Sequence, residues 1–135
     1  MSGSVFFDTN VLVCAIGEHA VRTPIAEALL ARGGVISVQV LNELAAVARR
    51  KLHMSWPEVT DALDAVRALC QAPLPVTAET HDLALRLATQ HGFHIYDALI
   101  VSAALEAGCA TLYTEDLQSG QIIDGRLRIQ NPFKV

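Results

Sequence analysis

One carboxylate interrupts the first apolar run of this sequence and constrains how the chain can fold. Residues 5–13 read Val-Phe-Phe-Asp-Thr-Asn-Val-Leu-Val, with Asp8 between two apolar triplets. This pattern predicts a short buried strand that ends at Asp8, followed by a helix capped by Thr9 or Asn10. A carboxylate in that position is shielded from water, which is costly unless a cation or hydrogen-bond donors meet it. The rest of the chain must therefore supply those partners.

The remaining sequence alternates helix-like and strand-like segments. Helical periodicity and end signals predict helices over residues 11–16, 24–32, 39–52, 58–69, 79–90 and 95–107. Short apolar runs predict further strands at residues 35–38, 74–76, 110–113 and 127–129. This alternation is typical of an α/β protein with a central, mostly parallel sheet of four or five strands. We expect a three-layer α/β/α sandwich that forms one domain over residues 1–135.

Two helix ends carry clear sequence signals. Ser55, Pro57 and Glu58 form an N-terminal signature, with Ser55 as the cap and Glu58 three residues after it. Gly92 is expected to close the helix that ends near residue 90. Trp56 lies within the first of these signals, and we expect its side chain to lie in the core or in a groove that a partner protein fills.

Composition limits the kinds of partner. Hydrophobic residues make up 52% of the 135 residues and charged residues only 18%. So few charged residues leave part of the surface apolar, which favours self-association or a dedicated protein partner. Ten basic and 14 acidic residues give a net charge of -4, so any contact with nucleic acid must be local. No apolar segment is long enough to cross a membrane. Three widely spaced cysteines suggest buried free thiols and a reducing cytoplasm.

Four acidic residues are predicted to meet at one edge of the sheet. Asp8 ends the first strand, Glu43 lies in the helix that leaves the second, Asp97 opens the apolar helix at 95–107, and Asp116 follows the strand at 110–113. Taken singly, an Asp after a strand is as often a helix cap, a helical Glu is usually exposed, and an Asp in a loop is usually a turn residue. Together, four acids would repel one another unless one or two divalent cations hold them.

The donor set indicates the metal and the chemistry. Ligands that are all oxygen suit Mg²⁺ or Mn²⁺ and not zinc. An ion of this kind activates water and neutralises charge on a phosphodiester, so hydrolysis of phosphodiester bonds is the reaction that these acids suit best.

With these four acids in order, the sequence resembles a known family, the PIN-domain nucleases. The resemblance is carried by Asp8-Thr9-Asn10, by Glu43 in Leu-Asn-Glu-Leu, by the segment Tyr-Asp-Ala-Leu-Ile at 96–100, and by Thr-Glu-Asp-Leu-Gln-Ser-Gly at 114–120. The ending Asn-Pro-Phe at 131–133 is similar to that of the VapC-like branch, the toxins of toxin-antitoxin pairs. No single motif is specific, but four in the same order are a strong signal.

The resemblance implies a metal-dependent endoribonuclease, active as a homodimer and silenced by a small antitoxin. Carried over position by position, it makes Asp8, Glu43 and Asp97 the core metal ligands and Asp116 the fourth acid. Thr114 would then hydrogen-bond within the site, and Asn10 would support the first motif. The chain departs from some members just before Asp97, where they have another acid and this sequence has Phe-His, so a second metal site would be weaker.

Several features have competing explanations. Arg49, Arg50 and Lys51 suit the carboxyl end of a helix without any further role, and contact with an RNA backbone is the alternative. His94 is expected to be a loop residue, because a metal that activates water makes a general base unnecessary. Two other functions are alternatives: a PIN-like module that binds RNA or protein without cutting, and an aspartate-based phosphatase, which would want a second Asp where the chain has Asn10.

Overall fold

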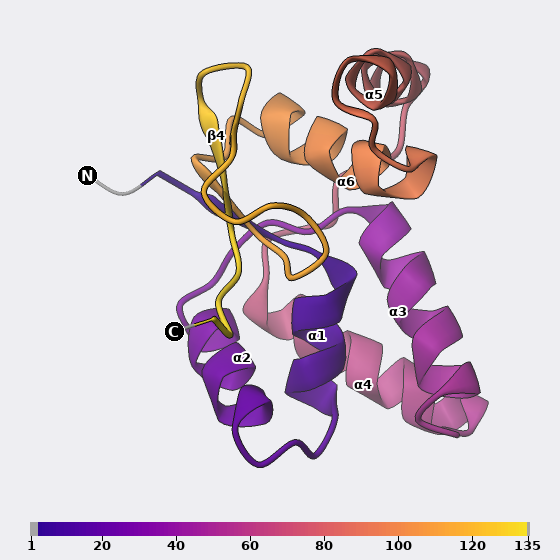
Figure 1. The fold of residues 1–135 in the computed structure, drawn as a ribbon. Helices are drawn as coiled ribbons and strands as arrows, with labels where there is room; N and C mark the ends of the chain where they lie inside the picture. The colour runs from indigo at the N-terminus through magenta and orange to yellow at the C-terminus, as the bar shows by residue number, and fades with distance from the viewer. Residues whose placement is uncertain (1–2, 135) are drawn as a thin grey trace.

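The structure, a computed structural model, describes residues 3–134 and arranges them as helices around a small sheet (Figure 1). In chain order the elements are β1 (Val5–Phe7), α1 (Thr9–Ile16), α2 (Arg22–Ala31), α3 (Val38–Arg50), α4 (Trp56–Leu69), α5 (Ala78–His91), α6 (Ile95–Glu106), β2 (Thr111–Tyr113), β3 (Ile122–Ile123) and β4 (Leu127–Gln130). The predicted helices are all present, with ends that differ by a few residues.

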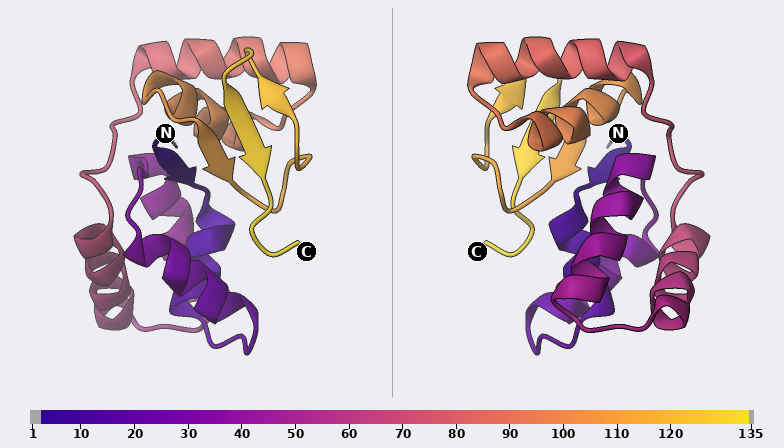
Figure 2. Two further views of the ribbon diagram at one scale, coloured as in Figure 1. Left: turned by 90° about the vertical axis from the view of Figure 1, so that its left-hand side faces the viewer. Right: turned by 90° about the vertical axis from the view of Figure 1, so that its right-hand side faces the viewer.

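The sheet has the strand order β1-β2-β4-β3. Strands β1, β2 and β4 are parallel, and β3 runs antiparallel to β4. Across the parallel strands Phe6 lies opposite Leu112, which lies opposite Ile129, and all three side chains are fully buried. Helix α5 packs on α6 at one side of the sheet, and α1 to α4 gather at the other (Figure 2). The predicted sandwich with a mostly parallel sheet is confirmed.

Two predicted strands are wrong, and one strand was missed. Residues 35–38 and 74–76 contribute only isolated bridges, from Val35 to Phe6 and from Ser37 to Leu74. The first segment cannot extend as a strand because Ser37 already caps α3, its hydroxyl accepting from the Val40 amide at 3.3 Å. The missed strand, β3, has two residues in a segment that reads as a loop in the sequence.

The two helix signals are confirmed. The Ser55 amide donates to Glu58 Oε1 at 2.8 Å and the Glu58 amide donates to Ser55 Oγ at 3.2 Å, which is the predicted capping box. Gly92 ends α5 at φ +75°, a conformation that favours glycine.

Trp56 is not a core residue, contrary to one expectation. Its side chain is 61% exposed, and the Arg49 guanidinium lies 4.5 Å from the centre of its ring. The reason is its place as the first residue of α4, where Val59 and Val66 already fill the buried side of the helix.

The sequence also predicted buried free thiols and no segment long enough to cross a membrane. Cys14, Cys70 and Cys109 are all free, and Cys109 is buried while the other two are half-buried. Burial raises the pKa of the Cys70 thiol to about 11. Across residues 3–134, no helix combines the length and the apolar character that crossing a membrane requires.

Candidate functional site

Asp8 directly follows β1 inside the protein, where hydrogen-bond donors contact both of its carboxylate oxygens. Its side chain is 4% exposed. The Thr9 amide donates to Oδ1 at 2.6 Å and the Thr114 hydroxyl donates to Oδ2 at 2.8 Å. Asp8 is also the N-cap of α1, so the prediction that Thr9 or Asn10 caps this helix is wrong: the backbone is already helical at Thr9. Asp8 therefore both caps a helix and faces the other acids.

Three of the four predicted acids lie together. Carboxylate oxygens of Asp8, Asp97 and Asp116 are all within 4.8 Å of one another. Asp8 and Asp116 follow the neighbouring parallel strands β1 and β2, whose carboxyl ends meet at one edge of the sheet, and Asp97 lies in the first turn of α6. We call these three residues the acidic cluster.

Glu43 lies beside the acidic cluster and is held by two neighbours. The Thr9 hydroxyl donates to Glu43 Oε1 at 2.7 Å, and Gln39 Nε2 donates to Oε2 at 2.8 Å. The Glu43 charge still raises the pKa of both Asp8 and Asp97. From the sequence, Thr9 was considered only as a helix cap and as part of the first motif. Gln39 was not singled out, although Gln39 and Glu43 have the spacing of neighbours on one helix face.

Thr114 links the segment that begins at Asp8 to the loop that carries Asp116 through three hydrogen bonds of its hydroxyl. Its side chain is fully buried, and its hydroxyl accepts from Asn10 Nδ2 at 3.2 Å and from the Asp116 amide at 3.1 Å while it donates to Asp8. Asn10 Oδ1 in turn accepts from the Glu115 amide at 3.4 Å. The two supporting residues thus fix the loop that carries Asp116 against the end of β1.

Burial and repulsion from neighbouring acids disfavour the charged forms of Asp8 and Asp97. Burial raises the pKa of Asp8 to about 7; the hydrogen bonds from Thr114 and Thr9 oppose this, and the Asp116 and Glu43 charges add to it. Burial likewise raises the pKa of Asp97, together with the Asp116 charge, against a lowering by His94. Left alone, these carboxyls would hold protons that ordinary aspartates release.

Within residues 3–134, no basic side chain forms an ion pair with the acidic cluster. The two ion pairs found among residues 3–134 are Arg22–Glu115 at 2.6 Å and Arg86–Asp124 at 2.7 Å, and neither includes a member of the cluster. Three carboxylate oxygens that converge, with no ion-pair partner in the part of the chain that the structure describes, fit a divalent ion such as Mg²⁺ or Mn²⁺. The residues present therefore fit the metal that the sequence implied.

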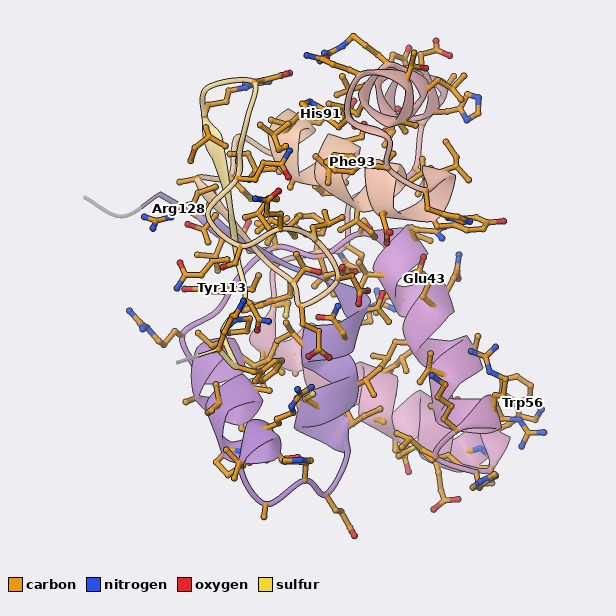
Figure 3. All side chains as sticks on the ribbon, in the orientation of Figure 1. Glu43, Trp56, His91, Phe93, Tyr113 and Arg128 are labelled. Carbon is orange, nitrogen blue, oxygen red and sulfur yellow. The ribbon has the colours of Figure 1, made fainter. Side chains whose placement is uncertain are left out.

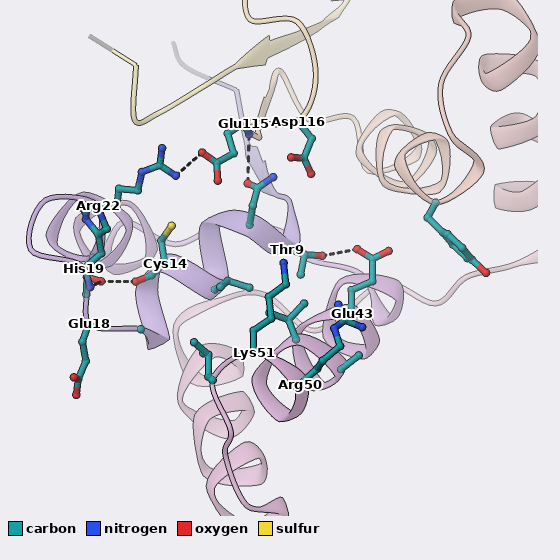
Figure 4. Close-up of a pocket in the computed structure, with 18 residues that line it drawn as sticks. Thr9, Cys14, Glu18, His19, Arg22, Glu43, Arg50, Lys51, Glu115 and Asp116 are labelled. Carbon is teal, nitrogen blue, oxygen red and sulfur yellow. Dashed lines mark hydrogen bonds and ion pairs between the residues drawn. The ribbon is translucent and has the colours of Figure 1, made fainter.

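A cleft of about 740 Å³ opens beside these acids (Figure 4). Its wall includes Glu43 and Asp116 together with Arg50 and Lys51, which follow Glu43 in the chain by about two helical turns. Lys51 points into the cleft in Figure 4. The third predicted cation, Arg49, is not among the lining residues.

Two more contacts were not predicted from the sequence. Arg22 from α2 lines the cleft, binds Glu115 next to Asp116, and lies 5.2 Å from the centre of the Phe133 ring. His94 is the N-cap of α6: its Nδ1 accepts from the Tyr96 amide at 3.3 Å. The Arg22 contacts have no sequence signal, because they depend on residues brought together by the fold. The His94 cap is local, since its partner is only two residues further on, but His94 had been expected to be a loop residue.

Comparison with protein families gives one match. The family model described as PIN domain matches residues 5–121. A comparison with curated proteins finds no significant match.

Several solved structures are similar in fold. One is a toxin-antitoxin complex from Klebsiella pneumoniae, 18% identical, with a TM-score of 0.74 over 98% of this chain and 100% of that chain. The Mycobacterium tuberculosis toxin VapC20, described as cleaving the sarcin-ricin loop, is 21% identical, with a TM-score of 0.67 over 84% of this chain and 90% of that one. VapBC2 from Rickettsia felis, bound to a DNA fragment from its promoter, is 24% identical, with a TM-score of 0.67 over 94% and 98%. At identities this low, the structural similarity demonstrates a shared fold and nothing beyond it.

Proposed function

Because this chain belongs to the PIN domain family, we propose that it is a metal-dependent endoribonuclease and the toxin of a toxin-antitoxin pair. The observation that carries the proposal is the acidic cluster, three carboxylates within 4.8 Å and without a basic partner in the described chain. A site of this kind is costly to build unless it holds a cation. The toxin assignment is supported by the similarity in fold to VapC20 and to the two toxin-antitoxin complexes.

In this proposal Asp8, Asp97 and Asp116 hold Mg²⁺ or Mn²⁺. Glu43, which the resemblance made a core ligand, stays a candidate ligand beside them. When bound, the ion would activate water and neutralise charge developing on the phosphodiester. The chain's own residues set the geometry: Thr114 and the Thr9 amide fix the two oxygens of Asp8, and Thr9 and Gln39 orient the Glu43 carboxylate. Orientation by such outer contacts is typical of metal sites.

The cleft supports RNA as the substrate. The net charge of -4 rules out binding by bulk charge, so backbone phosphates must be met locally. Arg50 and Lys51 line the same cleft as Asp116, and we propose that they contact the RNA backbone. Arg49 is engaged instead with the Trp56 ring and, through Nη1, with the Met54 carbonyl at 3.0 Å.

The alternatives explain the structure less well. A phosphatase that uses Asp8 as nucleophile would want a second Asp two residues on, yet that position is Asn10, whose side-chain amide is bound to Thr114 and to the Glu115 amide. A module that only binds RNA has no use for clustered acids, which repel phosphates.

The proposal is tested by incubating the purified protein, freed of any partner, with RNA and Mg²⁺ or Mn²⁺. We expect internal cuts that stop when a chelator is added. RNA binding without cutting would favour the binding module, and release of phosphate from a small aryl phosphate ester would favour the phosphatase. Either result, obtained without RNA cleavage, would overturn the nuclease assignment.

Thr114 provides a prediction about the support of the site. Thr114→Val keeps the shape but leaves Asp8, Asn10 and the Asp116 amide without their shared hydroxyl. We expect RNA cleavage to fall by about 10- to 100-fold and the free energy of unfolding by about 1–3 kcal/mol. Thr114→Ser, which retains the hydroxyl, is the matched control; if both variants cut equally fast, the hydroxyl has no such role.

We also propose a homodimer in the cytoplasm, with a small antitoxin as the natural partner. The support is the apolar surface: large hydrophobic side chains that are 50% exposed or more include Val21, Leu69 and Ile122. Light scattering at micromolar concentration is expected to give twice the mass of the chain. A monomeric mass under those conditions would contradict the dimer without affecting the nuclease assignment.

A further inference from the structure

We propose that the ring of Tyr96 stacks on the base of a nucleotide adjacent to the phosphodiester that is cut, and so positions the RNA at the acidic cluster. This inference rests on the proposed nuclease function. It assigns a task to an aromatic side chain that neither the metal site nor the core uses.

The position of Tyr96 is the first support. It is the second residue of α6 and directly precedes Asp97, and it lines the cleft together with Glu43 and Asp116. Its side chain is 56% exposed, although most large apolar groups of this chain are buried. An exposed aromatic ring beside acids that would hold a metal is therefore available to a ligand that enters the cleft.

The second support is the way the ring is held. The His94 ring packs against the Tyr96 ring, with centroids 5.4 Å apart and planes at 34°. His94 is itself fixed, because its Nδ1 accepts from the Tyr96 amide as the cap of α6. A ring restrained on one side by a capped neighbour loses less conformational freedom when it binds a base.

The third support is that the lining of the cleft contains both cationic side chains and an aromatic ring. A nucleotide presents a charged phosphate and a neutral base with two flat faces, and these need different surfaces. Arg50 and Lys51 offer cations for the backbone, whereas Tyr96 offers a flat aromatic face in the same lining. Proteins commonly bind unpaired nucleic acid with cations that meet the backbone and an aromatic ring on which a base stacks, and stacking of this kind accepts every base.

The experiment pairs a protein variant with a modified substrate. A short unstructured oligoribonucleotide that the wild-type protein cuts at one bond is prepared with a single abasic ribose at each position near that bond in turn. We expect Tyr96→Ala to lower kcat/KM by about 10- to 100-fold, and one abasic position to lower wild-type cleavage by a similar factor. At that position the two changes are not additive, because each removes the same contact.

Matched controls separate this inference from the nuclease assignment. Tyr96→Phe keeps the ring and is expected to cut like wild type. Trp56→Ala removes an aromatic ring that is similarly exposed but lies toward the far end of α3 from Glu43 (Figure 3), and it should leave cleavage unchanged. Stabilisation of Tyr96→Ala by Mn²⁺ in thermal unfolding, equal to that of wild type, shows that the metal centre is intact.

Two results would overturn the proposal. If Tyr96→Ala cuts as fast as wild type, or if its loss multiplies fully with the loss from every abasic position, the ring does not stack on a base. If wild type itself cuts no RNA, the nuclease assignment has failed, which is a different outcome from either of these.

Discussion

Asp97→Asn is expected to abolish RNA cleavage while the protein stays folded. This substitution keeps the size of the side chain but removes a negative charge from the acidic cluster, in which three carboxylate oxygens lie within 4.8 Å. Changes to groups that only orient metal ligands cost about 10- to 100-fold in activity, so loss of a ligand should cost more than about 100-fold. The rate of cutting of a defined RNA in Mn²⁺ measures the effect, and Asp8→Asn should behave in the same way.

The control is a carboxylate outside the cleft. Asp64 is exposed on α4, and Asp64→Asn changes the net charge by the same amount. We expect this variant to cut at the wild-type rate. If Asp64→Asn loses as much activity as Asp97→Asn, the effect comes from overall charge; if Asp8→Asn and Asp97→Asn both cut within a few-fold of wild type, the acidic cluster is not the catalytic centre.

The second large effect is on stability and depends on pH. Asp8 has a pKa of about 7 in the folded protein and 3.8 as its ordinary value. Its carboxyl is therefore neutral in both states below pH 4, and above that pH the unfolded chain releases a proton that the folded protein retains. The free energy of unfolding of the metal-free protein should consequently fall as the pH rises from about 4 to about 7 and then level off.

The size of this effect follows from the shift. At about 1.4 kcal/mol per pKa unit, the Asp8 carboxyl costs up to about 4 kcal/mol above pH 7. Asp8→Asn removes that cost, so at pH 8 the metal-free variant should be more stable than wild type, with a melting temperature higher by on the order of 10 °C. At pH 4 the two proteins should melt together. Equal melting temperatures at both pH values would contradict the account of Asp8.

Divalent metal should reverse the order of stability. An ion that binds only the folded protein stabilises it by mass action, and deprotonated Asp8 is the form that binds. Mn²⁺ at pH 8 is therefore expected to raise the melting temperature of wild type and to leave Asp8→Asn nearly unchanged. A substitution that stabilises the metal-free protein and removes its activity would show that the site was built at the expense of stability.

The parts of the fold that sequence could predict are those set by local chemistry. The capping box at Ser55 and the glycine at residue 92 involve backbone groups within three or four residues, so their patterns are complete in the sequence. The parallel sheet followed from alternating strands and helices. The segment 35–38 could not be predicted correctly, because Val35 and Ser37 each pair with a different neighbour and the helix begins at Val38.

The candidate site shows the same division. The four acids could be named because each borders an apolar segment, and strand ends meet at one edge of a parallel sheet. How these four side chains lie relative to one another could not be predicted. Glu43 is hydrogen-bonded to Thr9 and Gln39, whereas carboxylate oxygens of Asp8, Asp97 and Asp116 converge. The cleft could not be predicted from the sequence either, because Arg22 and Tyr96 line it from helices that are far apart in the chain.

The most direct test of the metal-dependent nuclease is cleavage of one defined RNA by protein stripped of metal with a chelator and then dialysed. The account predicts no cutting by the stripped protein and full recovery when Mg²⁺ or Mn²⁺ is added to wild type, with no recovery in Asp8→Asn. Cutting by the stripped wild-type protein at the same rate as with metal would contradict it.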